Sequence, residues 1–235
     1  MAELRPIQAV VFDAAGTLIR TCEPVGETYT RFARDFEVDL PAARLEDAVG
    51  RVMAAAPPNV YPGEAMAPAA VLEKHWWWER VREAFRAADQ MTRFSDFDAY
   101  FEKLWVHYGT TAAWELAPGA RAALEDLHER RYLLGLLSNF DQRLRPLLCD
   151  LGIHDLFDAV TLPADAGAAK PERLIFDVSL KRLGIANHRC VYVGDRAEED
   201  LVASKTAGLH PIDVASLATL AELPAWVEAL EKDLS

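Results

Sequence analysis

The stretch that decides the fold opens the chain, where residues 7–17 are IQAVVFDAAGT. Its first six residues form a short apolar run rich in β-branched side chains, which is typical of a buried parallel strand. Asp13 follows this run directly, and Gly16 permits a tight turn just after it. Ligands of parallel α/β sheets bind beyond the carboxyl ends of the strands, so Asp13 lies where such a ligand is expected.

Beyond residue 114, predicted strands alternate with predicted helices. Strands are predicted at 133–137 (LLGLL), 159–162 (AVTL), 190–194 (CVYVG) and 210–214 (HPIDV). Helices are predicted at ALEDLHERR, over the leucine-rich stretch that stops at Gly152, from Pro171 to Gly184, from Glu198 to Gly208, and over 220–233. Strands that alternate with helices predict the α/β class, with a Rossmann-like, doubly wound parallel sheet.

Residues 20–113 interrupt this alternation with helical patterns alone. These patterns are ETYTRFARDF, LEDAVGRVMAAA, AVLEKHWWWERVREAFRAA and FDAYFEKLWVHY. We therefore expect an all-helical domain at 20–113, inserted into a core formed by 1–19 and 114–235.

Composition excludes several classes of protein. The chain has 235 residues, 51% of them hydrophobic, and a formal net charge of −12. That charge disfavours nucleic-acid and anionic-membrane partners, so an anionic small-molecule substrate would need local cations. Three cysteines, without metal-ligand spacing, predict reduced and mostly buried thiols. With no signal peptide or membrane span, we expect a cytoplasmic protein. Its oligomeric state is left open, although the tryptophan-rich insertion could form a homodimer interface.

Polar residues follow the predicted strands where each strand ends. Asp13 follows the first, Ser138 and Asn139 follow 133–137, and Asp195 follows 190–194. Lys170 lies in the loop after 159–162. Because the carboxyl ends of parallel strands meet at one edge of the sheet, these side chains should converge.

Their chemistry suits phosphoryl transfer. Asp13 can act as a covalent nucleophile, in a turn whose backbone amides point towards a bound anion. The Ser138 hydroxyl can hold a further oxygen, and Lys170 supplies a positive charge for the phosphate and the nucleophile. Asp13, Asp195 and Asp200 together provide hard oxygen ligands for Mg²⁺, which would offset the repulsion between Asp13 and a phosphate dianion.

Four segments in order, VVFDAAGTL, LLSNFD, Lys170–Pro171 and VGDRAEED, resemble the signature motifs of the haloacid dehalogenase-like superfamily. The resemblance covers essentially the whole chain, because the helical insertion matches the family's cap domain in position. WWWER in the insertion and the form Asp-x-Ala-Gly-Thr-Leu are similar to the Reg-2-like branch.

The resemblance implies a role for each matching residue. Asp13 would be the nucleophile and a metal ligand, and Lys170 the charge-neutralising base. Phosphate would bind at Ser138, Asn139 and Thr17. The remaining metal ligands would be Asp195, the backbone carbonyl of Ala15, and Asp200, with Glu199 the less fitting alternative to Asp200.

One departure from the family's phosphatases affects the mechanism. They carry a second Asp two residues after the nucleophile, as general acid, where this chain has Ala15. Dehalogenases also lack that acid, and phosphonoacetaldehyde hydrolases carry Ala there with a cap lysine, for which only Lys74 and Lys103 are candidates. We expect a Mg²⁺-dependent phosphohydrolase acting on a small phosphorylated metabolite with a good leaving group. The alternatives are a 2-haloacid dehalogenase, a phosphonate C–P hydrolase, and a weakened, binding or regulatory member.

Overall fold

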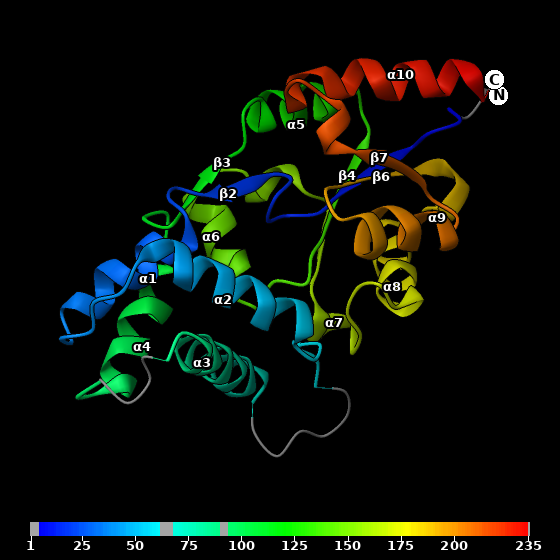
Figure 1. The fold of residues 1–235 in the computed structure, drawn as a ribbon. Helices are drawn as coiled ribbons and strands as arrows, with labels where there is room; N and C mark the ends of the chain where they lie inside the picture. The colour runs from blue at the N-terminus through cyan, green and yellow to red at the C-terminus, as the bar shows by residue number, and fades with distance from the viewer. Residues whose placement is uncertain (1–4, 62–67, 90–93, 235) are drawn as a thin grey trace. The chain divides into compact units, whose positions relative to one another are not determined.

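A computed structural model of the chain describes residues 5–61, 68–89 and 94–234. The chain forms two compact units, one mainly of Met1–Arg20 and Glu115–Ser235, the other of Thr21–Asn59 and Glu64–Trp114 (Figure 1). A parallel sheet forms the centre of the first unit, and four helices make up most of the second. In the part of the chain that the structure describes, every helix is too short or too polar to cross a bilayer.

The first unit contains five parallel strands in the order β5-β4-β1-β6-β7. Their bounds are β1 Ala9–Phe12, β4 Leu133–Leu137, β5 Ala159–Thr161, β6 Cys190–Gly194 and β7 His210–Asp213. From β1 the chain builds outward through β4 and β5, then returns to the other side of β1 for β6 and β7. The predicted α/β, doubly wound parallel fold is therefore confirmed, and the strand order reverses at β1.

Helices cover both faces of this sheet, since β1 and β6 are buried along their whole length. On one face, α8 (Arg173–Leu183) and α9 (Ala203–Thr206) pack against apolar residues of β1, β4 and β6. On the other side lie α5 (Ala120–Glu129) and α10 (Leu223–Asp233), which contact each other (Figure 1). Shorter helical elements of this unit are α6 (Leu144–Asp150), α7 (Pro163–Ala166) and a π-helical segment, Ala197–Val202.

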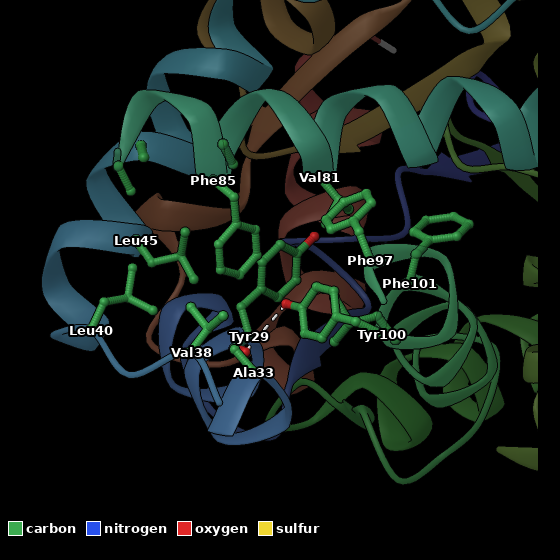
Figure 2. Close-up of a cluster of buried hydrophobic side chains, with 14 residues drawn as sticks. Tyr29, Ala33, Val38, Leu40, Leu45, Val81, Phe85, Phe97, Tyr100 and Phe101 are labelled. Carbon is green, nitrogen blue, oxygen red and sulfur yellow. Dashed lines mark hydrogen bonds between the residues drawn. The ribbon is translucent and has the colours of Figure 1, made fainter. Parts of the chain in front are cut away.

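The second unit is built from α1 (Val25–Arg34), α2 (Ala42–Ala55), α3 (Ala69–Ala87) and α4 (Phe97–His107). Apolar residues three and four positions apart give each helix one buried face. Figure 2 shows the resulting core, in which Tyr29, Phe85, Phe97 and Tyr100 bring their rings together. The Tyr100 hydroxyl donates a 3.2 Å hydrogen bond to the Tyr29 carbonyl, so this buried polar group has a partner inside the ring cluster.

Two details differ from the sequence expectations. A two-stranded sheet of β2 (Ile19–Thr21) and β3 (Trp114–Leu116) was not expected, because three residues are too few to show a strand periodicity. Helix α8 begins at Arg173 rather than Pro171. The reason is that Glu172, its N-cap, has an extended backbone with ψ 133°.

Candidate active site

Asp13 lies directly after β1, where the strand order reverses. Its backbone N–H donates to the Val193 carbonyl at 2.9 Å, which continues the hydrogen bonding between β1 and β6 as far as Asp13. The Asp13 side chain is buried, and its Oδ1 accepts a 2.7 Å hydrogen bond from Lys170 Nζ. Burial raises the pKa of Asp13 and outweighs the opposing effect of the Lys170 ammonium.

Lys170 reaches this position from the loop between α7 and α8. Its Nζ donates to Asp13 Oδ1, to Asp200 Oδ1 at 2.6 Å and to the Tyr192 hydroxyl at 3.0 Å. An ammonium has three N–H groups, so all three are used. Burial by itself would lower the pKa of Lys170, but the charges of Asp13 and Asp200 outweigh burial and raise it. The ammonium is thus held charged, against the expected nucleophile.

Asn139 fixes the backbone of Lys170. The Asn139 Nδ2 donates to the Lys170 carbonyl at 3.0 Å, and the Lys170 N–H donates to Asn139 Oδ1 at 2.8 Å. Both polar atoms of the amide therefore hold the Lys170 loop against the end of β4. Phosphate binding by Asn139 stays a prediction, and its side chain is engaged with Lys170 in this structure.

The segment after β6 contributes two carboxylates in different surroundings. Asp200 is fully buried and accepts hydrogen bonds from Lys170 Nζ, the Tyr192 hydroxyl, and the backbone N–H groups of Asp195 and Arg196. A carboxylate offers about four lone-pair positions, so Asp200 is saturated. Asp195 is exposed as a residue, but its carboxylate is half-buried, while Glu199 pairs with Arg196 at 3.3 Å.

Oxygen atoms of Asp13, Asp195 and Asp200 lie within 4.8 Å of one another. Three carboxylates against one ammonium leave two net negative charges at this edge of the sheet. Burial first, and then Asp13 and Asp200, raise the pKa of Asp195. Clustered hard oxygen donors with excess negative charge fit a divalent cation such as Mg²⁺.

Two glycines make this close approach of carboxylates feasible. Gly16 has φ +93°, and a Cβ added there would meet Asp195 Oδ2 at 2.4 Å. A Cβ at Gly194 would meet the Asp200 Cβ at 2.5 Å. Side chains at either position would displace a carboxylate from the cluster.

The turn after Asp13 only partly matches the expected anion cradle. The N–H groups of Gly16 to Ile19 all donate to carbonyls within the turn itself, those of Ala14 and Ile19. In the described residues, the backbone groups of Ala15 make no such bond, so its N–H and carbonyl stay available. The buried Thr17 Oγ1 has no hydrogen-bond partner among the described residues. Buried Ser138 accepts a 3.3 Å bond from the Phe140 N–H through Oγ, which leaves its hydroxyl hydrogen to donate.

Tyr192 is a member of the site that the sequence did not single out. It occupies the middle of β6, CVYVG, in which all five residues are buried and the neighbouring side chains are apolar. Burial and the charges of Asp13 and Asp200 raise its pKa well above the ordinary value, so the hydroxyl keeps its proton. The sequence signal that could have identified Tyr192 is a hydroxyl-bearing side chain in an apolar strand, because a buried hydroxyl needs a hydrogen-bond partner.

A doubly wound parallel sheet with a carboxylate cluster at its switch point is typical of α/β proteins that bind a ligand at that edge of the sheet. Comparison with known proteins identifies the family. The chain belongs to the haloacid dehalogenase-like hydrolases, whose family model matches residues 7–208. The haloacid dehalogenase-like hydrolase domain-containing protein 3 of Mus musculus is 29% identical over 92% of this chain and 84% of its own. The rhythmically expressed gene 2 protein of Drosophila melanogaster is 24% identical over 58% of this chain and 55% of its own, in line with the resemblance to the Reg-2-like branch.

Proteins that are similar to this chain in sequence or in fold include phosphatases and a dehalogenase. A glyceraldehyde 3-phosphate phosphatase of Methanothermobacter thermautotrophicus is 37% identical over 45% of this chain and 47% of its own. Among solved structures, a phosphatase of Thermococcus onnurineus matches with a TM-score of 0.63 and 22% identity, over 94% of this chain and 98% of its own. A 2-haloacid dehalogenase of Pseudomonas syringae matches equally well, with a TM-score of 0.63 and 19% identity, over 95% and 99%. The fold thus does not distinguish a phosphatase from a dehalogenase. The residues of the site have to make that distinction.

Proposed function

We propose that this protein is a Mg²⁺-dependent phosphohydrolase acting on a small phosphorylated metabolite with a good leaving group. The observation that carries the proposal is the carboxylate cluster of Asp13, Asp195 and Asp200 beside the Lys170 ammonium. A dehalogenase attacks carbon and needs no divalent cation to approach its substrate. Two excess negative charges at the site favour instead a cation that brings a phosphate dianion to Asp13.

The reaction would proceed in two displacements at phosphorus. One oxygen of Asp13 forms a bond to phosphorus as the bond to the leaving oxygen breaks, which gives an aspartyl phosphate. Water then attacks that phosphorus, releases inorganic phosphate and restores the Asp13 carboxylate. Lys170 neutralises Asp13 through Oδ1 and favours the approach of the phosphate. The Ser138 hydroxyl and the free Ala15 N–H can donate to phosphate oxygens.

Asp13, Asp195 and the Ala15 carbonyl are the groups that would hold Mg²⁺. When bound, the ion supplies positive charge that screens the nucleophile from the phosphate. Asp200 already accepts four hydrogen bonds. We therefore assign it to orienting Lys170 and the Asp195 loop, with Glu199 outside the cluster.

Ala15 determines the class of leaving group. Its methyl side chain cannot protonate a departing alkoxide. The carboxylate of an acyl phosphate and the nitrophenolate of a nitrophenyl ester leave without a proton. We assign no Schiff-base role to the lysines of the helical unit. Lys74 pairs with Glu102 at 2.7 Å and Lys103 with Asp35 at 3.0 Å, so both amines are engaged in exposed ion pairs.

The proposal is tested with p-nitrophenyl phosphate, acetyl phosphate and a 2-haloacid, each assayed with Mg²⁺ and with excess EDTA. We expect Mg²⁺-dependent phosphate release that Asp13→Asn reduces by about a thousandfold or more, because the amide cannot form the aspartyl phosphate. Asp177→Asn, an exposed acid that pairs with Arg173 on α8, is the control and should retain activity. Halide release in EDTA would establish the dehalogenase instead, and full activity of Asp13→Asn would exclude covalent catalysis by Asp13.

A further inference from the structure

Tyr192 is held rigidly in the centre of the sheet. On β6 it lies opposite Val11 of β1, and its side chain is fully buried. Its ring packs edge-on against Phe176 of α8, with the ring centroids 5.5 Å apart. Neither the backbone nor the ring can move without disturbing the strand or the helix, so the hydroxyl is a fixed point.

That hydroxyl closes a triangle with Lys170 and Asp200. It accepts from Lys170 Nζ at 3.0 Å and donates to Asp200 Oδ1 at 2.9 Å, the same oxygen that Lys170 Nζ contacts at 2.6 Å. The other acceptor in reach, the Leu137 carbonyl, is farther away at 3.4 Å. A phenol has one hydrogen to donate, and the triangle uses it while its oxygen receives the ammonium.

We propose that Tyr192 is a positioning residue that aims the Lys170 ammonium at Asp13 Oδ1. This inference rests on the proposed function, in which Lys170 neutralises the attacking carboxylate. Asp13 and Asp200 compete for the ammonium at nearly equal distances, 2.7 and 2.6 Å. The hydroxyl occupies the third N–H, which fixes the rotation of the ammonium and keeps one N–H directed at Asp13. Without it, the ammonium can turn toward Asp200, and the charge of Asp13 is less well balanced as attack begins.

The test compares two tyrosines that each lose one buried hydroxyl. Tyr192→Phe keeps the ring against Phe176 and removes the hydroxyl, with its contacts to Lys170 and Asp200. Tyr100→Phe is the matched control, since Tyr100 is also fully buried and its hydroxyl donates to a backbone carbonyl in the helical unit. With p-nitrophenyl phosphate at saturating Mg²⁺, we expect Tyr192→Phe to lower kcat by about tenfold with KM changed less than about twofold, as small misplacements of reacting groups do. Tyr100→Phe should leave both constants unchanged.

Thermal unfolding of both variants separates positioning from loss of structure. We expect similar midpoints for the two, with the fall in kcat confined to Tyr192→Phe. An unchanged kcat for Tyr192→Phe, beside an inactive Asp13→Asn, would overturn the role of Tyr192 alone. A rise in KM at constant kcat would also overturn it, because that pattern reports lost substrate binding. Activity retained by Asp13→Asn would instead overturn the proposed function, and this inference with it.

Discussion

At the residue scale, the position two residues after Asp13 separates this chain from the phosphatases that it resembles. Ala15 is half-buried, and its backbone N–H and carbonyl are the groups that it can offer. A carbonyl can bind a metal ion, but it cannot carry a proton between leaving group and water. In the proposed reaction, the charge of Asp13 would be neutralised, but position 15 would give the leaving group no proton.

Ala15→Asp should therefore widen the range of substrates. A positioned general acid contributes about 10²–10⁴ in rate, which is about 3–5 kcal/mol of barrier. We expect turnover of an alkyl phosphate such as glyceraldehyde 3-phosphate to rise by about tenfold or more, with little change in bond breaking for p-nitrophenyl phosphate.

Ala15→Asn is the control for this change, because the amide has a similar shape but no acidic proton to transfer. Steady-state rates on both substrates, with hydrolysis of the phosphoenzyme measured separately, distinguish the two variants. Efficient hydrolysis of glyceraldehyde 3-phosphate by the unaltered protein would refute the leaving-group restriction and would indicate a substitute acid elsewhere.

At the element scale, helices α3 and α4 stabilise the helical unit through their shared ring cluster (Figure 2). Phe85 is fully buried and contacts the Tyr100 ring edge-on, with centroids 5.2 Å apart. We expect Phe85→Ala to lower the free energy of unfolding by about 3–5 kcal/mol, because it removes buried surface and leaves a cavity. Val71→Ala on the same helix, at a side chain 56% exposed, should change it by less than about 0.5 kcal/mol in denaturant titrations. Equal effects of the two would contradict this account of the core.

Strand β6 buries the thiol of Cys190, whereas Cys22 and Cys149 are exposed. The expectation of mostly buried thiols was thus wrong, because short apolar stretches around a cysteine do not reveal whether the element faces solvent. Burial raises the pKa of Cys190 to about 12, and the thiolate is the reactive form. An aromatic disulfide reagent at pH 8 should therefore titrate two thiols in the native protein and three after denaturation. Three thiols reacting at one rate without denaturant would show that β6 opens readily.

At the scale of the whole molecule, the net charge of −12 opposes an anionic substrate. Salt screens this repulsion, since the Debye length falls from about 30 Å at 0.01 M to about 8 Å at 0.15 M ionic strength. With Mg²⁺ saturating, we expect kcat/KM for p-nitrophenyl phosphate to rise by about twofold over that range while kcat stays constant. A steep fall with salt would mean that a local cationic surface governs substrate capture. The small anionic substrate and the cytoplasmic location stay predictions.

Local patterns in the sequence determined the elements and the residues that end them. A buried strand followed by Asp13, and the later strands followed by Ser138 and Asp195, imply a parallel sheet with its polar ends on one edge, because strand period and turn chemistry are short-range properties. The helical insertion follows in the same way from its apolar spacing. Those patterns cannot show a contact between residues far apart in the chain, nor a strand of three residues such as β2 or β3.

The tertiary structure decided how the side chains share their hydrogen bonds. Lys170 meets Asp13 across 157 positions of the chain, and Tyr192 completes its set of partners from another strand. Asn139 matches a phosphate-binding position by sequence, yet its side chain hydrogen-bonds to the Lys170 backbone. The Asp200 carboxylate accepts hydrogen bonds from four donors. These assignments depend on burial and on competition among donors and acceptors, which only packing of the strands and loops together establishes.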